Sequence, residues 1–439
     1  MAKILVVDDD ASIRETLVTF LELENYAVDS AASTEEAIAK LQSEAFPIVI
    51  SDVYLDERTG LDILNAAKNA NPDCSVILMS GRGTIETVME ATKRGAFDYV
   101  AKPFDLDKML EIIHRAEEAA RGSDDEDADV EDLPVSEMIG SSPAMVEVYK
   151  TIVKAAPSDV TVLIEGETGT GKELVARLLH NLSRRAAQPF VPVDCGSITG
   201  SLLESELFGA MRGAYTGADR DRVGALEAAH NGTVFLDEIG EIDEGFQLRL
   251  LRFLQEREVR PLGASRAKKV DVRVIAATNK DLAKRMEEKR FREDLFYRLN
   301  VVPIKLPALR DRRGDIPLLA ETFVGKANER YRLNARITKS GMRAMEEYAW
   351  PGNVRQLQHM IERLSILAPQ YRIDEEAVLD AIQSLSSRDG QGGESLADTE
   401  ADQIKKVLAA TSGNKSRAAK ILGIERKTLY RKLEKMGLG

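Results

Sequence analysis

The sequence contains little that would place this protein in a membrane or outside the cell. Cysteine occurs only twice in 439 residues, at Cys74 and Cys195, and two isolated thiols exclude a disulfide framework. No apolar run approaches the roughly 18 residues that a membrane-spanning helix needs. The first apolar run meets Asp8 too early to serve as a signal peptide. We therefore expect a cytoplasmic protein.

The sequence also lacks a net positive charge, since its formal net charge is −13 at pH 7. This value argues against a general affinity for nucleic acids. The charge is uneven, however, because residues 400–439 contain ten Lys and Arg against four Asp and Glu, a net +6. A basic C-terminal segment on an acidic body is typical of proteins that bind DNA through one small domain.

The composition divides the chain into three parts. A length of 439 residues suggests about three domains, and a hydrophobic content of 44% is enough for a core in each. Residues 124–132 hold seven acidic residues among nine, and residues 386–394 are polar and rich in glycine, so both stretches read as linkers. The predicted organisation is a domain at 1–122, an acidic linker at 123–133, a domain at 134–385, a linker at 386–395 and a domain at 396–439.

Apolar runs alternate with helical stretches in residues 1–122, which predicts an α/β doubly wound fold with a parallel sheet. Polar residues follow the predicted strands, at the edge where function gathers in such sheets. Three carboxylates at that edge would repel each other, and a hard divalent cation such as Mg²⁺ would relieve the repulsion. Without the other residues, however, acids at these positions could equally well be solvent-exposed strand ends with no function. The strand-end residues are Asp8, Asp9, Asp52, Ser80 and Lys102.

These residues resemble the receiver domain of two-component response regulators. The resemblance rests on four segments, at 6–9 (VVDD), 51–52 (SD), 79–81 (MSG) and 101–104 (AKPF). It implies that Asp52 accepts a phosphoryl group from a sensor histidine kinase, and that Asp8 and Asp9 hold Mg²⁺ with it. The loop at 54–60 lacks the Met-Pro pair usual in such domains. Residues expected to sense the phosphoryl group are Ser80, Lys102 and Tyr99.

The central part contains a glycine-rich loop, residues 166–172 (GETGTGK), directly after the apolar run 160–164. Such a loop lets backbone N–H groups surround a polyphosphate, and Lys172 reaches the β- and γ-phosphates. A helix that begins after the loop directs its positive end at the same charge. The predicted ATP-binding residues of this loop are Gly166, Glu167, Thr168, Gly169, Thr170, Gly171, Lys172 and Glu173.

Two further strand ends predict hydrolysis of the bound nucleotide. The strand 234–236 ends in Asp237, which would hold Mg²⁺, and Glu238, which would polarise the attacking water. A second apolar strand, 272–277, leads to Asn279, which would orient that water. We therefore expect an ATPase that uses ATP and Mg²⁺. Three distant arginines would stabilise the transition state unless they are plain surface charges, and they are Arg292, Arg298 and Arg355.

One residue departs from the general phosphate-binding loop, because Glu173 stands where Ser or Thr normally binds Mg²⁺. The loop instead resembles that of one AAA+ family, the sigma-54-dependent transcription activators of the NtrC type, which usually has Glu there. The resemblance covers nearly all of 134–370, and includes 206–209 (ELFG), 235–240 (FLDEIG), 291–299 (FREDLFYRL) and 350–355 (WPGNVR). It implies an α/β AAA+ P-loop domain with a helical lid at about 310–385.

The stretch 213–218 (GAYTGA) indicates what the hydrolysis is for. Its glycines permit large backbone changes and Tyr215 offers an aromatic anchor, although a tight loop with a core-packed tyrosine has the same pattern. In the resembled family this loop grips sigma-54, and the usual aromatic is Phe. The expected sigma-54 contacts are Gly213, Ala214, Tyr215, Thr216, Gly217 and Ala218.

The resemblance also assigns the arginines and reveals a second departure. Arg292 and Arg298 would act on the neighbouring subunit and Arg355 within its own, in dimers that assemble into hexamers or heptamers. Asp194 stands where the family normally has Asn, a residue thought to restrain the catalytic Glu. If Asp194 faces Glu238, the two carboxylates would repel and one pKa would rise.

Residues 396–439 predict an all-α helix-turn-helix, with Asn414 as a helix N-cap and a glycine turn at Gly423. The segment resembles the Fis-type helix-turn-helix that ends the same activator family. A basic helical hairpin that binds protein is the alternative. The residues expected to contact DNA are Lys415, Arg417, Arg426, Lys427, Thr428, Tyr430 and Arg431.

The three parts together predict a phosphorylation-activated transcriptional regulator of a two-component system. It would bind upstream DNA, oligomerise and hydrolyse ATP to remodel sigma-54 RNA polymerase for open-complex formation. A DNA-binding regulator, such as a repressor, with a weak or vestigial ATPase is the first alternative, and Asp194 and Tyr215 are its only support. A protein remodeller that does not bind DNA is disfavoured by the basic C-terminal segment.

Overall fold

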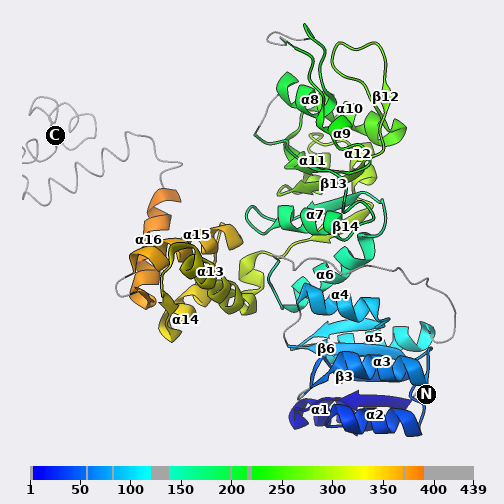
Figure 1. Ribbon diagram of the computed structural model, residues 1–439. Coiled ribbons are helices and arrows are strands. Elements are labelled where there is room, and N and C mark those ends of the chain that lie inside the picture. Colours follow the sequence, from blue (N-terminus) through cyan, green and yellow to red (C-terminus); the bar gives the residue numbers. More distant parts are fainter. Residues whose placement is uncertain are drawn as a thin grey trace, which may run out of the picture. The chain divides into compact units, whose positions relative to one another are not determined.

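The computed structural model describes residues 3–55, 58–81, 84–119, 138–197, 200–214, 220–368 and 371–389 (Figure 1). The chain divides into two compact units. The first consists of the described residues within Met1–Lys326 and Glu346–Glu362, and the second of those within Ala327–Met345 and from Arg363 onward. Among the described residues, no helix has both the length and the apolar character that a membrane crossing requires.

The N-terminal part is a five-stranded parallel sheet in the order β2-β1-β3-β6-β7 (Figure 1, blue to cyan). This order confirms the predicted doubly wound fold. Its strands are β1 (Lys3–Val7), β2 (Ala27–Ala31), β3 (Ile48–Asp52), β6 (Ser75–Ser80) and β7 (Asp98–Ala101), with a short hairpin of β4 (Tyr54–Leu55) and β5 (Arg58–Thr59). Its helices are α1 (Ala11–Leu23), α2 (Thr34–Ser43), α3 (Gly60–Ala70), α4 (Ile85–Lys93) and α5 (Leu106–Ala119).

Side chains that alternate along the central strands bury both faces of this sheet. On one face, Val6 of β1 packs in a cluster with Leu17 of α1 and Ile113 of α5. On the other face, the neighbouring Leu5 packs in a cluster that includes residues of α2, α3 and α4. Because every strand is parallel and every crossover is helical, the carboxyl ends of all five strands meet at one edge.

The central part is a second five-stranded parallel sheet, in the order β14-β8-β13-β10-β9. Strand β8, which precedes the glycine-rich loop, lies between β13 and β14, so the loop emerges beside the end of β13. The strands are β8 (Val162–Glu165), β9 (Phe190–Asp194), β10 (Thr233–Asp237), β13 (Arg273–Thr278) and β14 (Val302–Lys305).

Helices cover both faces of the second sheet. The main helices are α6 (Pro143–Ala155), α7 (Lys172–Asn181), α8 (Ser201–Phe208), α9 (Ala225–Ala228), α10 (Glu244–Glu256), α11 (Leu282–Glu287) and α12 (Glu293–Leu299). Shorter elements are the 3₁₀ turns η1 (Ile239–Glu241), η2 (Leu309–Asp311) and η3 (Arg313–Asp315), and the hairpin of β11 (Glu258–Val259) and β12 (Lys268–Lys269). Helices α6 and α7 share one hydrophobic cluster with the sheet, and α8, α10 and α12 share another.

Two buried charged residues fix the ends of α6. Arg273 of β13 is fully buried and donates to the backbone carbonyls of Ala155 (2.9 Å) and Ala156 (2.7 Å) at the C-terminal end of the helix. Burial lowers the pKa of this guanidinium to about 10. Asp315 accepts hydrogen bonds from the backbone amides of Ser141 (2.7 Å) and Ser142 (2.9 Å) at the N-terminal end. Both contacts satisfy backbone groups that a helix leaves unpaired.

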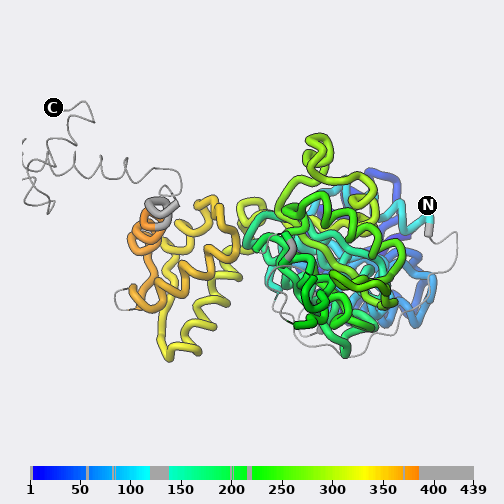
Figure 2. The backbone as a smooth tube through the Cα atoms, turned by 90° about the horizontal axis from the view of Figure 1, so that it is seen from above, coloured from blue at the N-terminus to red at the C-terminus, as the bar shows by residue number. Residues whose placement is uncertain are grey.

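The segment after η3 is helical, as predicted for a lid (yellow to orange in Figure 2). It contains α13 (Ile316–Tyr331), α14 (Lys339–Glu347), α15 (Asn353–Leu367) and α16 (Glu375–Asp389), with the parallel pair β15 (Arg336–Ile337) and β16 (Arg372–Ile373). Helix α16 continues to Asp389, past residue 386 where the sequence predicts the start of a linker. Residues 386–389 are polar but include neither Gly nor Pro, so they do not end the helix, and the first glycine of the predicted linker is Gly390.

We predict that Gly60→Ala destabilises the N-terminal part. A Cβ at this position would lie 2.1 Å from the backbone oxygen of Asp52, so the chain would have to move. The expected loss is about 1–3 kcal/mol, the usual cost of overpacking, seen as a lower midpoint of thermal unfolding. Gly81→Ala is the matched control, because a Cβ there meets nothing within 4 Å. Equal midpoints for the two variants would contradict the prediction.

Candidate functional site

The first sheet brings the predicted strand-end acids together. Ligand oxygens of Asp8, Asp9 and Asp52 all lie within 4.8 Å of one another. Asp8 and Asp52 are 0% and 7% exposed, whereas Asp9 faces solvent. The Nζ atom of Lys102, at the end of β7, donates to Asp8 Oδ2 at 2.6 Å and also to Asp52 Oδ2. A carboxylate acceptor and a cation that can pair with it therefore lie side by side.

The charges of this acid cluster are only partly balanced. Burial raises the pKa of Asp8, although the hydrogen bond from Lys102 opposes the rise. Burial alone would lower the pKa of Lys102, but its hydrogen bonds with Asp52 and Asp8 outweigh this effect and raise the pKa. Three carboxylates facing one ammonium leave negative charge over, and carboxylate oxygens are the donors that Mg²⁺ prefers. The donor set therefore fits a divalent cation.

The two other predicted sensing residues lie inside this sheet. Ser80 ends β6 and is fully buried, and Tyr99 of β7 is 2% exposed. Burial raises the pKa of the Tyr99 hydroxyl. The aromatic ring is therefore packed inward beside the predicted phosphoryl-sensing serine.

The glycine-rich loop of the second sheet turns directly from β8 into α7, which begins at Lys172. Gly169 and Gly171 adopt φ values of 80° and 106°, in the left-handed region that favours glycine. The Nζ atom of Lys172 folds back onto the loop and donates to the carbonyls of Gly166 (2.9 Å) and Glu167 (3.3 Å). The ammonium of Lys172 therefore lies against the backbone of the loop.

Three predicted catalytic residues, Lys172, Asp237 and Glu238, and the predicted ATP-binding residue Arg355 lie close enough to affect the pKa of Lys172. Burial lowers the pKa of Lys172 and the charge of Arg355 lowers it further, while Asp237 and Glu238 oppose the change. Burial raises the pKa of Asp237, against the charge of Lys172. Glu238 has a φ of 54°, a left-handed conformation that is strained for glutamate. Such strain clusters at functional sites.

The neighbouring strand ends complete the arrangement. Asn279, just after β13, donates from Nδ2 to Thr168 Oγ1 of the loop at 3.0 Å. Asp194 lies opposite Asp237 in the register of β9 and β10. Its carboxylate accepts hydrogen bonds from the amides of Gly196 (2.9 Å) and Ser197 (3.2 Å) and from the Ser197 hydroxyl.

Asp194 does not show the raised pKa considered above. Burial pushes its pKa upward, but the hydrogen bonds from Ser197 and Gly196 hold it below its ordinary value. The raised pKa belongs to Asp237, where the charge of Asp194 adds to burial. Glu238 lies over the backbone of Gly196, because a Cβ there would approach Glu238 Oε2 to 2.2 Å. The carboxylate of Asp194 thus shapes the turn under Glu238.

The two arginines predicted to act between subunits lie on or beside α12. Arg292 precedes the helix and pairs with Asp294 through Nε (3.0 Å) and Nη2 (2.7 Å). Arg298 is exposed within the helix. In the described part of the chain, neither side chain forms a recorded hydrogen bond or ion pair with residues 166–173. Arg355, by contrast, donates its backbone amide to the carbonyl of Gly169 at 3.2 Å.

Several predicted contacts lie outside the described residues. Gly213 and Ala214 are described, with Gly213 at a φ of 80°, whereas the following residues are not. Those outside are Tyr215, Thr216, Gly217, Ala218, Lys415, Arg417, Arg426, Lys427, Thr428, Tyr430 and Arg431.

Sequence reasoning missed three residues whose side chains donate to the glycine-rich loop. Arg310 and Asn353 both contact Glu167, and Arg312 donates to the carbonyl of Thr170 at 3.3 Å. Asn353 falls inside the quoted segment 350–355, so the family pattern marked its position without giving it a role. Arg310 had no such signal, because a single arginine in a charged turn has no pattern of its own.

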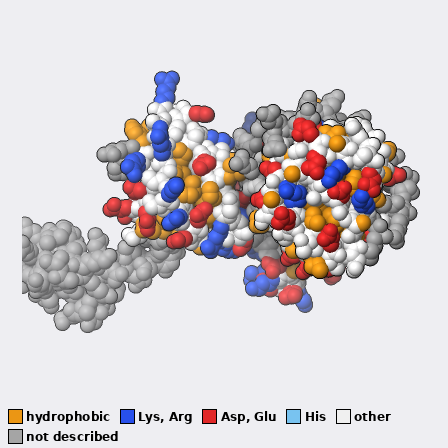
Figure 3. Space-filling view, turned by 90° about the horizontal axis from the view of Figure 1, so that it is seen from below, with side chains coloured by type: hydrophobic (Ala, Val, Ile, Leu, Met, Phe, Trp, Pro, Cys, Tyr) orange, Lys and Arg blue, Asp and Glu red, His pale blue; other side chains and the backbone are white. Residues whose placement is uncertain are grey.

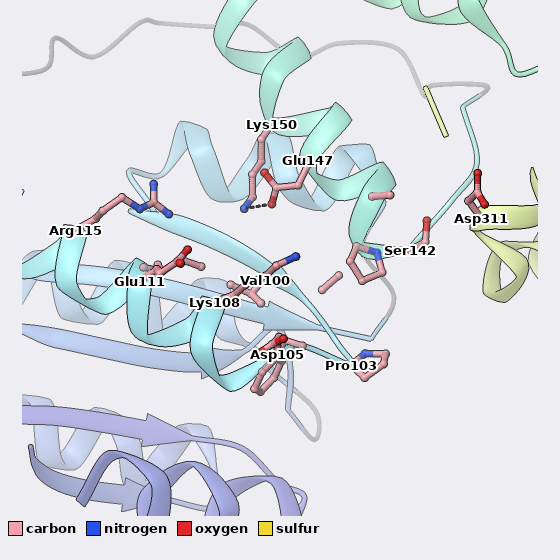
Figure 4. A pocket seen from close by; sticks show the side chains of 15 residues that line it. Val100, Pro103, Asp105, Lys108, Glu111, Arg115, Ser142, Glu147, Lys150 and Asp311 are labelled. Atoms are coloured by element: carbon pink, nitrogen blue, oxygen red, sulfur yellow. Dashed lines mark hydrogen bonds and ion pairs between the residues drawn. The ribbon is translucent and has the colours of Figure 1, made fainter. Parts of the chain in front are cut away.

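A cavity of about 640 Å³ lies beside β7, α5 and α6, and Ala101 and Pro103, on either side of Lys102, belong to its lining (Figure 4). Lys108, Glu111 and Arg115 line it from α5, and Pro143 and Glu147 from α6. At its edge, Lys150 of α6 pairs with Asp98 of β7 at 2.5 Å. No residue of the glycine-rich loop lines this cavity, so the nucleotide chemistry predicted from the sequence belongs elsewhere.

Four family models match the chain in sequence. They are described as response regulator receiver domain (residues 4–114), Sigma-54 interaction domain (138–305), AAA+ ATPase lid domain (310–395) and Bacterial regulatory protein, Fis family (395–436).

Curated relatives match the chain from end to end. The chain is 44% identical to the transcriptional regulatory protein ZraR of Salmonella typhimurium, over 98% of each chain. It is 40% identical to the C4-dicarboxylate transport transcriptional regulatory protein DctD of Rhizobium meliloti, over 99% of this chain and 94% of the relative. It is 38% identical to the DNA-binding transcriptional regulator NtrC of Rhizobium meliloti, over 100% and 98%.

A solved structure is similar over the same extent. It is that of NtrX from Brucella abortus in complex with ADP, with 34% identity, 99% of each chain covered and a TM-score of 0.55. The NtrX structure in complex with ATP has the same identity and coverage, with a TM-score of 0.52.

We predict that Asp8→Asn weakens Mg²⁺ binding at the acid cluster by roughly tenfold or more, because even indirect partners of a bound metal contribute that much to its affinity. The measurement is calorimetric titration of the full chain with Mg²⁺ in the absence of nucleotide. Asp73→Asn, an exposed acid in a loop of the same part, serves as the control and should bind as the wild type does. An unchanged affinity in Asp8→Asn would show that the three carboxylates do not share a cation.

Proposed function

Because the chain belongs to the NtrC-type family of sigma-54-dependent response regulators, we propose that it is a phosphorylation-activated ATPase bound to upstream DNA. It uses ATP hydrolysis to remodel sigma-54 RNA polymerase for open-complex formation. The observation that carries the proposal is that Lys172 folds onto the glycine-rich loop, where the backbone of Arg355 also contacts it and the charges of Asp237 and Glu238 reach the Lys172 ammonium. This charge arrangement sits in a chain that carries a receiver, a sigma-54 interaction domain, a lid and a Fis-type helix-turn-helix.

In the proposed reaction, the amides of residues 166–173 and the ammonium of Lys172 hold the triphosphate of ATP. Asp237 holds Mg²⁺, which neutralises phosphate charge when bound. Glu238 polarises the attacking water and Asn279 orients it. Arg355 approaches the γ-phosphate from its own subunit. Arg298, which is exposed, and Arg292, which is partly exposed, act on the site of a neighbouring subunit in a dimer that grows to a hexamer or heptamer.

The proposed switch is the acid cluster of the first sheet. A sensor histidine kinase supplies a phosphoryl group to Asp52, while Asp8 and Asp9 hold Mg²⁺ with it. Lys102 neutralises the added charge, since it already pairs with Asp52. Ser80 and Tyr99 report the change, because both are buried, Ser80 ends β6, and the charge of Asp52 reaches Tyr99.

The proposed partners occupy the remaining segments. The loop at Gly213, Ala214, Tyr215, Thr216, Gly217 and Ala218 contacts sigma-54. The basic segment at 396–439 binds DNA in the cytoplasm, through the side chains named for it above. Over the face drawn in Figure 3, basic and acidic side chains are interspersed, so this face of the body offers no broad basic stripe. The domain boundaries predicted from the sequence are part of this proposal, except that the second linker begins after Asp389, where α16 ends.

We predict that Lys172→Ala lowers ATP turnover on the order of 100-fold or more, because a positive group facing the transition-state charge is lost. Open-complex formation with sigma-54 RNA polymerase should fail in the same variant. Turnover and a promoter-opening assay measure the two effects. Lys284→Ala, an exposed lysine on α11, is the control and should behave as the wild type. Normal activation by Lys172→Ala would favour a DNA-binding regulator that needs no hydrolysis.

We also predict that Asp52→Asn abolishes the response to a phosphoryl donor. Wild-type protein treated with acetyl phosphate should change both its oligomer size and its rate of ATP turnover, because the added charge alters the contacts of Lys102. The variant cannot form the acyl phosphate and should keep its untreated size and rate. Light scattering and a turnover assay follow the two properties. Asp29→Asn, which removes a pair with Lys40 in the same part of the chain, should still respond. A response retained by Asp52→Asn would place the switch elsewhere.

A further inference from the structure

The glycine-rich loop contains an acidic residue, Glu167, in a place built to receive a polyphosphate. An uncompensated carboxylate there would repel the ligand. Its oxygens are instead covered by three N–H donors. Arg310 donates to Glu167 Oε1 at 2.5 Å and to Oε2 at 2.9 Å, and Asn353 Nδ2 donates to Oε2 at 3.1 Å. The first effect of this arrangement is that Arg310 neutralises the charge of the loop's own acid.

Asn353, at the start of α15, belongs to the turn at residues 350–355, the lid-side turn, and joins this turn to the loop. Its side chain is fully buried and all of its polar groups are used. Nδ2 donates to the carbonyl of Thr168 at 3.1 Å as well as to Glu167, and Oδ1 accepts from the amide of Leu309 at 2.8 Å. Its φ of 52° is a left-handed conformation. A buried amide in an uncommon backbone conformation persists only where several contacts determine it together.

Backbone contacts bring the same turn against the loop. The amide of Arg355 donates to the carbonyl of Gly169 at 3.2 Å. A Cβ on Gly169 would lie 2.4 Å from the oxygen of Gly352 and 3.1 Å from Cβ of Arg355, so only glycine permits the approach. Behind the turn, Trp350 is fully buried and packs edge-on against Tyr348, with ring centroids 5.1 Å apart. The position of Arg355 is thus set by its contact with the loop.

We propose that Glu167 is a positioning residue for ATP binding, which holds Arg355 at the phosphate site through Arg310 and Asn353. The inference rests on the proposed ATPase function. The carboxylate of Glu167 does not touch the nucleotide, since its oxygens are engaged by protein donors and carry the wrong charge for a phosphate. It acts by fixing the lid-side turn against the loop, so that the turn is in place before the ligand arrives.

The contact is suited to a positioning role because its loss should leave the protein folded. The Glu167 and Arg310 side chains are 44% and 42% exposed, and pairs this exposed contribute little to global stability. The hydrogen bonds from Arg310, followed by that from Asn353, hold the pKa of Glu167 at about 2. The carboxylate therefore stays ionised throughout the neutral range, and its effect should not vary with pH there.

The test is the affinity for ATP of Glu167→Gln, measured with a fluorescent ATP analogue in the Glu238→Gln background, which prevents hydrolysis. A glutamine amide would direct an N–H₂ group at one of the existing donors, so at least one charged hydrogen bond is lost. We expect the dissociation constant to rise roughly tenfold, with the unfolding midpoint of the nucleotide-free protein nearly unchanged. An affinity equal to that of the parent would overturn the inference.

A double-mutant cycle distinguishes positioning from direct contact. If Glu167 acts through Arg355, then Glu167→Gln should change the affinity by less than about twofold once Arg355→Ala is present, because coupled residues are not additive. A full effect in both backgrounds would mean that Glu167 meets the nucleotide directly, and the inference would fail. Restored affinity in the charge-reversed pair Glu167→Arg with Arg310→Glu would support it further.

The matched control is Asp159→Asn. Asp159 forms the same kind of two-bond pair with Arg185, at 2.9 Å for each bond, but outside the loop and the lid-side turn. This variant should bind the analogue as its parent does, and a tenfold loss there would overturn the assignment to Glu167. If the parent protein with an intact Glu167 binds no ATP at all, the proposed function fails first. Normal parent binding with no effect of Glu167→Gln defeats the inference alone.

Discussion

Like charge gathered at the carboxyl edge of a parallel sheet is the constraint on which both sites of this protein depend. Parallel strands joined by helical crossovers bring polar residues from distant positions to one edge, and in both sheets several of these residues are acids. The cluster of Asp8, Asp9 and Asp52 is held against Lys102, and the pair of Asp237 and Glu238 lies against Lys172. In each case one lysine from a neighbouring strand end or loop offsets only part of the charge. The remainder makes each edge receptive to a cation and, with it, a phosphoryl group.

The sequence was informative where local pattern and topology coincide. Apolar runs predicted the central strands of both sheets, and the rule that parallel strands end together predicted that Asp52 and Lys102 would meet although 50 residues separate them. The same reasoning placed Asp237 beside Lys172. Pattern alone did not reveal the contacts of Glu167 with Arg310 and Asn353, which bridge 143 and 186 residues. Those contacts depend on how a turn folds back over a loop, and neither residue lies at a strand end.

Asp194, in place of the Asn usual in the family, illustrates a second limit of prediction from sequence, namely the surroundings of a single side chain. The sequence alone raised the prospect of two repelling carboxylates, because Asp194 stands where the resembled family normally has an Asn that restrains the catalytic Glu. The backbone offers Asp194 a closer partner, since the amides of Gly196 and Ser197 turn toward it and lower its pKa. A short acidic side chain that finds local amides is the same device that caps helices and closes turns. The course of the backbone after β9 decides whether Asp194 meets Glu238 or these amides, and no residue pattern specifies that course.

The left-handed backbone at Glu238 has a consequence for how this chain can change over generations. Glycine would adopt a φ of 54° more readily than glutamate does, so the position where the attacking water is proposed to be activated is held at some expense of folding stability. Selection for a more robust fold alone would therefore favour the loss of this carboxylate. If ATP hydrolysis became dispensable, replacement of Glu238 would gain stability without loss of function, and we would expect it early. A glutamate retained there indicates a fold that has not been optimised for stability alone.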